Sequence, residues 1–462
     1  MIPRGAALLA ILVAVASLQC RKAEGVPENA IEREAEEAFV AYLRIDTTSG
    51  KETAGATYLR DLLTKNGIAA TLAGADPARQ AVYARLASGS PEPALLLLSH
   101  IDVVAADAER WRNPPFSGKR EGGYIWGRGA VDAKSLTIAQ VMSLLDLKRR
   151  GARLRRDVIF LAVPDEERGG LVGMKQLLER QPELFTNVGF VLNEGGANET
   201  AVDRVLFWGV EVQQKVPLWL RVTAEAAGGH GALSEGHGGA PAKLVRALAA
   251  IDQLETPYRL TDTVARVASL GAKMRKDHRG AALQLIREPL DIARIERELA
   301  PGYRTMLRDS ITITQISAPG AVNVVPSRAF ADIDIRLVAG TKPDEMLARV
   351  EQAAGTNAIV EVLVAGDPVA ESPVDTELFA TLKRVFTAAA PGSSLAPTIS
   401  PGATDSRWFR ARGITAYGIA PFKLNYYDAD GVHGDNERIR ARFFAEGVGV
   451  MRKIVREFCE KR

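Results

Sequence analysis

The chain has 462 residues, which is long enough for two or three domains with sizeable hydrophobic cores. Hydrophobic residues make up 47% and charged residues 25% of the chain, the balance of an ordinary soluble globular protein. Lys plus Arg number 59 and Asp plus Glu 56, so no charge excess points to nucleic acid or an anionic membrane as a main partner. Two cysteines and five histidines exclude a disulfide scaffold, a cysteine-based zinc cluster and a His-rich metal site.

The N-terminus has the pattern of an export signal. The apolar run 6–16 is too short to span a bilayer, which takes about 20 residues, but it suits the apolar core of a secretory signal peptide over residues 1–19. Two interpretations stay open. The small residues 14–16 offer a cleavage site, whereas Cys20 would be the lipidated first residue of a bacterial lipoprotein, although Gln19 is bulky for such a signal. We expect an exported protein, periplasmic or secreted, that is either free or anchored through a lipid on Cys20.

Short apolar runs alternate with amphipathic stretches through most of the chain. Buried runs separated by helices indicate an α/β domain with a mainly parallel sheet. A helical face that includes Phe39 marks where this domain begins, and a long amphipathic helix over 439–458 closes it. The predicted strands are 94–98, 158–163 and 190–192, and the predicted helices between them are 135–149 and 171–180.

From about residue 215 to residue 369 the pattern changes to strict alternation of apolar and polar residues, as in 310–317 and 332–337. Period-two alternation indicates a sheet with one buried face and one polar face. With helices expected near 242–254 and 343–354, this segment is predicted to be an α+β domain inserted into the α/β domain. The predicted boundaries are 28–214 for the first part of the α/β domain, 215–369 for the inserted domain and 370–462 for the second part.

Each of the three predicted strands is followed by side chains of a type that can bind a metal ion. His100 follows the first strand, Glu166-Glu167 the second and Glu194 the third, and Asp132 precedes the helix 135–149. Each signal taken singly has an ordinary structural explanation. His100 could be a hydrogen-bonded structural residue, the glutamates could belong to a solvated loop, and Asp132 could be the N-cap of a helix. Taken together, they lie at strand ends that form the ligand crevice of an open α/β sheet, where adjacent buried acids repel unless a cation lies among them. Imidazole with several carboxylates and no thiolate is the ligand set of a catalytic zinc site.

These residues belong to a series of motifs in fixed order: Ser99-His100-Ile101-Asp102-Val103-Val104, Trp111, Pro114-Pro115-Phe116, Gly127-Arg128-Gly129 through Asp132 and Lys134, Asp165-Glu166-Glu167, Asn193-Glu194-Gly195-Gly196, Thr404-Asp405-Ser406-Arg407 and Val432-His433-Gly434-Asp435-Asn436-Glu437. The series resembles the co-catalytic di-zinc peptidases, the family of aminoacylase, succinyl-diaminopimelate desuccinylase and carboxypeptidase S. It is most similar to the branch of carboxypeptidase S and the N-acyl amino acid hydrolases. The resemblance runs from about residue 30 to the C-terminus, and such an ordered series is more specific than any single motif.

The resemblance implies two Zn²⁺ ions per subunit, with Co²⁺ or Mn²⁺ as substitutes. His100 and Glu194 would bind one ion, Glu167 and His433 would bind the other, and Asp132 would bridge both.

Two further acids have implied roles in catalysis. Asp102 would not be a ligand but would hold the imidazole of His100 in the required tautomer. Glu166 would be the general base on the metal-bridging water and would then return the proton to the leaving amine. Neighbouring side chains of an extended segment point in different directions, so Glu167 can ligate while Glu166 faces the water.

The inserted domain would be a lid that also carries the dimer contact. His230, in Gly228-Gly229-His230-Gly231, resembles the lid histidine that stabilises the oxyanion, often from the neighbouring subunit, which implies a homodimer through the lid. Gly231 stands where the family usually has Ser or Ala, and His237 is the alternative histidine.

Other residues resemble the substrate contacts of the family. Asn323 and Arg336 would form a substrate-binding pair, and the guanidinium of Arg336 suits a free α-carboxylate. The alternative for Arg336 is a strand-surface ion pair with Asp332 or Asp334. Gly402, Thr404 and Arg407 would line the carboxylate end of the pocket, where Pro401 and Ala403 depart from the neighbours that are usual in the family.

The sequence therefore predicts zinc-dependent hydrolysis of an amide bond next to a free α-carboxylate, as in a carboxypeptidase-type exopeptidase acting on small peptides. One alternative is an N-acyl amino acid amidohydrolase, and another is a catalytically silent metal-binding homologue, whose signature would be loss of the base or a ligand. Serine hydrolases, thermolysin-like enzymes and Walker-type nucleotide hydrolases lack their motifs here. The segment 258–304 is longer than a minimal lid needs, and its sequence does not indicate what it does.

Overall fold

The computed structural model describes residues 30–201, 203–234, 238–275, 277–424 and 431–461. The predicted signal segment 1–19, Cys20 and His237 lie outside the described residues, so the expectations about them stay predictions. Within the described ranges, no helix is both long and apolar enough to cross a membrane.

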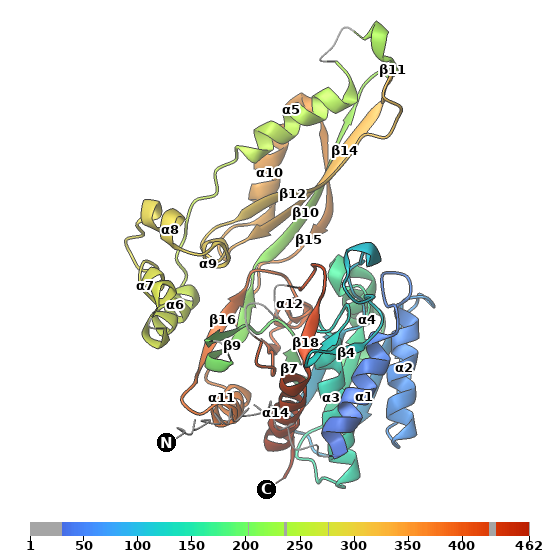
Figure 1. Ribbon diagram of the computed structural model, residues 1–462, viewed down its shortest axis with the longest axis vertical. Helices are drawn as coiled ribbons and strands as arrows, with labels where there is room; N and C mark the ends of the chain where they lie inside the picture. Colours follow the sequence, from blue (N-terminus) through green and yellow to red (C-terminus); the bar gives the residue numbers. More distant parts are fainter. Residues whose placement is uncertain (1–29, 202, 235–237, 276, 425–430, 462) are drawn as a thin grey trace, which may run out of the picture.

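The larger domain is built on a nine-stranded sheet (Figure 1). Its strands are β1 (Ala70–Ala73), β2 (Ala81–Leu86), β3 (Ala94–His100), β6 (Val158–Val163), β7 (Val188–Asn193), β8 (Asn198–Ala201), β9 (Arg204–Gln214), β16 (Ser394–Ser400) and β17 (Thr415–Gly418). The order is β1-β2-β6-β3-β7-β17-β9-β16, with β8 paired to β9. The central strands β6, β3, β7 and β17 run parallel, whereas β2 and β9 run antiparallel to them. The prediction of an α/β domain with a mainly parallel sheet is confirmed.

Helices cover both faces of this sheet because its central strands are apolar on both faces. In β3, Leu95 and Leu97 belong to one apolar cluster, and Leu96 and Leu98 belong to another. Such two-sided burial is what a continuous apolar run predicts. The first cluster includes residues of α1 (Ala30–Leu43), α2 (Glu52–Lys65), α3 (Lys134–Arg149), α11 (Glu377–Ala389) and α14 (Ala441–Cys459), and the second includes residues of α4 (Gln176–Arg180) and α12 (Ser406–Arg410).

Two helix predictions are wrong in detail. Ile439 lies in the short strand β18 (Arg438–Arg440), which pairs with β5 (Tyr124–Trp126) beside β4 (Lys119–Glu121), and α14 begins only at Ala441. Ile439 is fully buried in the strand, and an apolar residue directly before an amphipathic helix gives no signal that separates the two states. The predicted helix 171–180 is α-helical only in α4, because Leu171–Lys175 forms a π-helical turn.

The smaller domain, here called the lid domain, projects from one edge of the larger domain (Figure 1). Its antiparallel sheet has the order β12 (Ser310–Ser317), β14 (Arg328–Leu337), β10 (Val216–Glu225), β15 (Ile359–Ala365). The helices α5 (Ala240–Asp252) and α10 (Pro343–Ala354) share an apolar cluster with the buried residues of β10 and β14. A short ribbon of β11 (Gly229–His230) and β13 (Val324–Val325) lies at the far tip.

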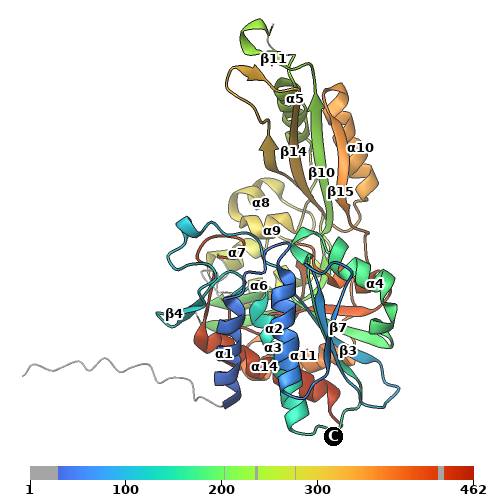
Figure 2. The same cartoon turned by 90° about the vertical axis from the view of Figure 1, so that its right-hand side faces the viewer.

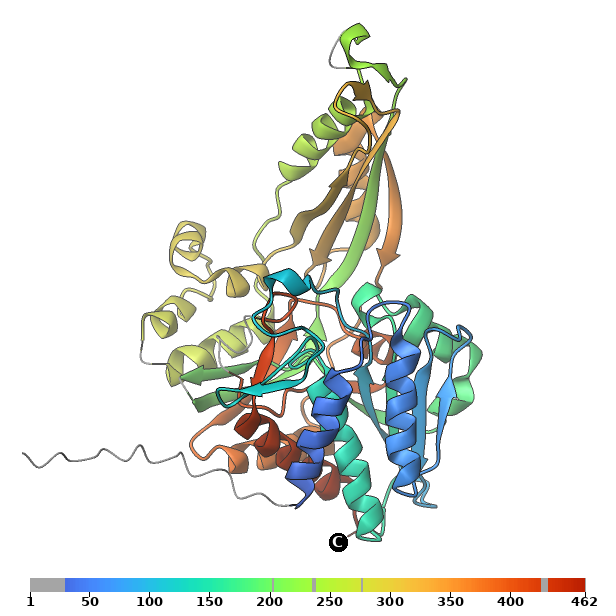
Figure 3. The ribbon, with the colours of Figure 1, turned by 45° about the vertical axis from the view of Figure 1, so that its right-hand side comes forward.

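The segment 258–304 forms a helical group that packs on the larger domain rather than on the lid sheet. Figures 2 and 3 show this group beside the larger domain, below the lid sheet. Val267 shares an apolar cluster with Phe207 of β9 and Ala396 of β16, so the group covers the edge of the central sheet. The helices are α6 (Asp262–Met274), α7 (His278–Leu283), α8 (Ile292–Glu298) and α9 (Pro301–Thr305).

The same helical group also contacts the start of the lid. Lys215 lies between β9 and β10, and its buried ammonium donates hydrogen bonds to the carbonyl oxygens of Thr305 (3.1 Å) and Arg308 (2.9 Å). Asp309 accepts from the backbone N–H of Val338, directly after β14, at 2.8 Å. The end of the helical group is therefore attached to both strands at the base of the lid sheet.

Candidate active site and metal centre

The carboxyl ends of three neighbouring parallel strands meet at one edge of the central sheet. β3 pairs with β6 and β7, and His100 lies opposite Val163 in the register. His100 ends β3, the 3₁₀ turn Glu166–Arg168 follows β6, and Glu194 follows β7. The predicted side-by-side arrangement of these three strand ends is confirmed by the pairing.

The base of the lid sheet lies against this edge. Gly169 directly follows the Glu166–Arg168 turn and has a φ of 98°, a conformation that favours glycine. A Cβ atom on Gly169 would lie 3.2 Å from Val364 of β15 and 3.7 Å from Trp219 of β10. The loop that carries the predicted base and ligand therefore packs directly under the lid.

A compact set of metal-binding side chains lies at the edge. The imidazole Nε2 of His100 lies 2.9 Å from Asp132 Oδ1, and the Nε2 of His433 lies 3.2 Å from Asp132 Oδ2 and 3.0 Å from Glu167 Oε2. One donor atom each from His100, Asp132 and Glu167 falls within 4.8 Å of the others. Two imidazoles and two carboxylates are donors that suit zinc and similar divalent ions, so these residues fit the metal that the family resemblance implies. Asp132 lies between the two histidines.

Unbalanced negative charge surrounds this set. Burial raises the pKa of Glu194 to about 8, and the Asp132 carboxylate acts in the same direction. Burial also raises the pKa of Glu166 well above its ordinary value, against the opposing effect of His100. Hydrogen bonds to Asp132 and Glu167 raise the pKa of His433 to about 10. Glu194, Glu166 and His433 therefore hold their protons more strongly than usual. A divalent cation bound here would balance the negative charge in place of those protons.

The Asp102 carboxylate holds the turn that follows β6. It accepts hydrogen bonds from the backbone N–H groups of Glu166 (3.2 Å) and Glu167 (3.0 Å). The imidazole Nδ1 of His100 contacts the backbone carbonyl oxygen of Asp102 at 2.9 Å, while the carboxylate oxygen lies at 3.8 Å. The main chain of Asp102 therefore contacts the imidazole, and its side chain positions the two glutamates.

Two buried acids beside the site have no role in the motif analysis. Asp165, at a φ of 75°, directly precedes Glu166 and pairs with Arg79, which also pairs with Glu52 at 3.0 Å. Glu437 is fully buried and contacts the loop that carries Asp132. Both acids lie in the series of motifs only as neighbours of residues with an assigned role, so the sequence offers no signal for their contacts.

The predicted lid contacts fall into two separate places. His230 and Asn323 lie together at the far tip, where the backbone N–H of Gly231 donates to the Asn323 carbonyl oxygen at 2.8 Å (Figure 1). Arg336 lies instead near the base of β14, donates to Asp334 at 2.7 Å and has its guanidinium carbon 5.3 Å from the centre of the Trp219 ring. The strand-surface ion pair considered for Arg336 is thus present in this structure.

After β16 the chain becomes buried from Thr404 to Arg407, whereas Gly402 is half-buried. Thr404 donates through its hydroxyl to Gln214 at 3.1 Å, and the Gly402 N–H donates to the hydroxyl of Ser400 at 3.2 Å. Arg407 donates to the carbonyl oxygen of Gly169, in the loop after Glu166 and Glu167. Arg407 is therefore in contact with the edge, whereas Thr404 and Gly402 serve as hydrogen-bonded parts of the loop.

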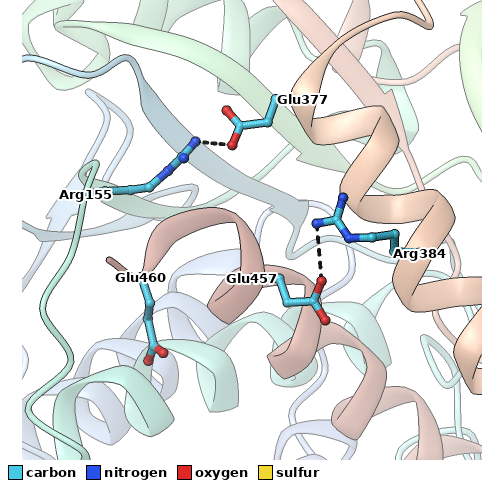
Figure 4. Close-up of a pocket in the computed structure, with 5 residues that line it drawn as sticks. All are labelled: Arg155, Glu377, Arg384, Glu457 and Glu460. Carbon is cyan, nitrogen blue, oxygen red and sulfur yellow. Dashed lines mark hydrogen bonds and ion pairs between the residues drawn. The ribbon is translucent and has the colours of Figure 1, made fainter. Parts of the chain in front are cut away.

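A hollow of about 450 Å³ lies at the opposite end of the sheet, where Arg155 precedes β6 (Figure 4). Arg155 pairs with Glu377 and Arg384 pairs with Glu457, the latter at 3.3 Å. Glu460 also lines the hollow and pairs with Arg150 at 2.7 Å. Because each of these charges has a partner, the hollow is an ion-pair surface.

Comparison with known proteins identifies the family. The model of Peptidase family M20/M25/M40 matches residues 96–457. The chain belongs to this family. N-fatty-acyl-amino acid synthase/hydrolase PM20D1 of Xenopus tropicalis is 31% identical over 356 residues, which cover 74% of this chain and 68% of the relative. Aminoacylase-1 of Mus musculus is 28% identical over 364 residues, 78% of each chain.

The solved structures agree on the fold. The M20 family metallo-carboxypeptidase Sso-CP2 from Sulfolobus solfataricus matches with a TM-score of 0.72 at 20% identity, over 91% of this chain and 98% of that one. The predicted resemblance to the family of aminoacylase and carboxypeptidase S is confirmed, and this M20 chain is a hydrolase.

The geometry around Asp132 yields a prediction about metal content. Asp132→Ala removes the carboxylate that contacts both histidines, so we expect the wild-type protein to take up two metal equivalents and the variant to retain neither. Zinc content after dialysis, measured by elemental analysis, checks this. His278→Ala, on α7 in the helical group, is the matched control and should keep both equivalents. Two fully occupied sites in Asp132→Ala would contradict the bridging role.

Proposed function

We propose that this M20 hydrolase cleaves the amide bond next to a free α-carboxylate of small peptides, as a carboxypeptidase-type exopeptidase. The observation that carries the proposal is the gathering of His100, Asp132 and Glu167 donor atoms within 4.8 Å, next to Glu166 at the lid-facing edge. Metal-assisted amide hydrolysis needs imidazole and carboxylate ligands for the metal and a further carboxylate, here that of Glu166, that can accept a proton from water.

Two divalent ions are part of the proposal. His100 and Glu194 would hold one, Glu167 and His433 would hold the other, and Asp132 would hold both. Bound there, the metals would supply Lewis acidity that lowers the pKa of water and polarises the scissile carbonyl.

Glu166 moves the proton in the proposed mechanism. It takes a proton from the attacking water and returns it to the leaving amine. The hydrogen bonds from the backbone of Glu166 and Glu167 to Asp102 fix the turn, which directs Glu167 toward His433 and leaves Glu166 without that partner.

The free carboxylate of the substrate would bind near Arg407 and Arg336. Burial lowers the pKa of Arg407, and the charge of Arg336 acts in the same direction, which indicates that the two cations lie near one another. The Nε of Arg407 is buried and has no hydrogen-bond partner among the residues that the structure describes. Two neighbouring guanidinium groups, of which Arg407 has a donor without a partner, suit a carboxylate.

A second candidate is hydrolysis of N-acyl amino acids. Such a substrate carries the same free α-carboxylate beside an amide bond, so the residues proposed above would serve it without change. The relatives support this candidate, because one is named an N-fatty-acyl-amino acid hydrolase and another an aminoacylase.

We also propose that two copies associate through their lid domains. The strand β11, which ends at His230 and pairs with Val324 directly after Asn323, lies at the tip, remote from the larger domain of its own chain (Figure 1). His230 and Asn323 would therefore act on substrate only in a neighbouring copy. The tip also exposes apolar side chains: Leu233 is 84% exposed and Val322 is fully exposed. Exposed apolar residues at such a position are typical of a protein contact.

The general base can be tested directly. Glu166→Gln keeps the shape of the side chain but cannot accept the proton, so turnover should fall at least ~10²-fold while both metals stay bound. Turnover and zinc content are measured on the same sample. Glu183→Gln, an exposed acid away from the site, is the control. Wild-type turnover in Glu166→Gln would remove this residue from the role of base.

The substrate class can be tested with paired compounds. N-blocked dipeptides and N-acyl amino acids should be cleaved only with a free carboxylate, and their carboxylate-amidated analogues should not, because the amide offers no charge to Arg336 and Arg407. Cleavage is measured as purified, after chelation and after zinc is returned. The preferred acyl group decides between the two candidate functions. Equal cleavage of the amidated analogues would contradict the proposed contact between the substrate carboxylate and the two arginines. It would not contradict the proposed metal site.

The proposed contact between lid domains predicts a dimer. Negative charges introduced at the tip of the lid should dissociate it. The double variant Leu233→Asp/Val322→Asp should shift the mass measured by light scattering from two chains to one, and turnover should fall with zinc content unchanged. Val374→Asp places the same charge on an exposed residue of the larger domain and should stay dimeric. A wild-type protein that has the mass of one chain would contradict the proposal.

A further inference from the structure

Glu437 is built into the loop that carries Asp132. Its carboxylate is fully buried and accepts three backbone hydrogen bonds, from the N–H groups of Gly129 (2.9 Å), Val131 (2.7 Å) and Asp132 (3.0 Å). The loop therefore curves around this one side chain, and the N–H of Asp132 itself is one of the three donors.

Arg128 completes the contact between two distant segments. Its Nη1 donates to Glu437 Oε2 at 2.7 Å, and its Nη2 donates to the carbonyl oxygen of Gly434 at 2.7 Å. The backbone adds a further bond, from the Gly127 N–H to the Glu437 carbonyl oxygen at 3.0 Å. The loops that carry Asp132 and His433 are about 300 residues apart in sequence, and these bonds tie them together.

The buried carboxylate of Glu437 and its hydrogen-bond donors depend on one another energetically. A buried carboxylate is costly unless its oxygens are satisfied, and here four donors satisfy them. Removing one partner leaves buried N–H groups without an acceptor, which costs more than the net value of the bond. The loop can therefore take this shape only while the carboxylate of Glu437 is in place.

We infer that Glu437 is a positioning residue for the metal centre, which it serves by setting the Asp132 carboxylate opposite the imidazole of His433. The inference rests on the proposed function, in which Asp132 and His433 hold a metal ion. In the structure these two side chains lie 3.2 Å apart, Nε2 to Oδ2. Glu437 binds the backbone of the Asp132 loop and follows His433 by four residues, so it fixes both sides of that contact. Its carboxylate oxygens are occupied by Arg128 and the backbone of the Asp132 loop, so its proposed action on the metal centre is indirect.

The variant Glu437→Gln tests this role. Its amide NH₂ cannot accept a hydrogen bond, so part of the N–H set loses its acceptor although the side chain keeps its size. Zinc affinity should fall about 10-fold to 100-fold, the usual effect of losing a group that orients metal ligands. The affinity is measured by competition with a chromogenic chelator. The rise in Tm when zinc is added to the metal-free protein should shrink as well.

A matched control separates positioning from general stability. Asp157 also binds an arginine and a backbone N–H, from Arg85 and Ser88 at 2.7 Å each, but it lies before β6 at the opposite end of the sheet. Asp157→Asn should lower the Tm of the metal-free protein and leave zinc affinity and the zinc-induced rise in Tm unchanged.

The outcomes distinguish this inference from the proposed function. Wild-type zinc affinity in folded Glu437→Gln would overturn the inference alone, and absence of zinc binding by the wild-type protein would overturn the proposed function. If Glu437→Gln does not fold, Glu437→Asp decides by the same measurement, because it keeps the charge beside Arg128 and shortens the side chain by one methylene. A folded Glu437→Asp with unchanged zinc affinity would also overturn the inference.

Discussion

Negative charge gathered at one edge of the central sheet is the constraint on which the site depends. Asp132, Glu167 and Glu194 meet there at the ends of parallel strands or beside them, and the imidazoles of His100 and His433 contact this group. Burial, together with the charge of Asp132, raises the pKa of Glu194, and hydrogen bonds to Asp132 and Glu167 raise the pKa of His433, so this edge favours added positive charge. Divalent cations would supply that charge, so metal binding and the stability of this edge are linked.

The fold holds these acids mainly through their backbone. Asp102 accepts the N–H groups of Glu166 and Glu167, and Glu437 accepts that of Asp132. Because the main chain is fixed in this way, the side-chain oxygens stay free to bind other groups. The lid sheet then closes over the same loop at Gly169, and the helical group 258–304 attaches the base of the lid to the larger domain.

The sequence predicted the strand ends because continuous apolar runs, buried on both faces, leave little doubt about β3 and β6, and a parallel sheet brings their carboxyl ends to one edge. It could not predict the role of Glu437, which depends on contact with a loop about 300 residues away. The apolar pattern predicts Ile439 at the start of the last helix, whereas it lies in β18, because burial of an apolar side chain is common to strands and helices. The motifs also gave no distances, so nothing in them separated Asn323 at the lid tip from Arg336 at its base. The docking of 258–304 depends on Phe207 and Ala396, which belong to strands far away in the chain.

The central claim is that Asp132 joins two metal ions at this edge. Crystals grown with zinc and measured at the zinc absorption edge test it most directly, because anomalous scattering locates the ions without reference to activity. The account predicts two peaks about 3.5–4 Å apart with Asp132 between them, one beside His100 and the other beside His433. A single peak, or peaks away from Asp132, would contradict it.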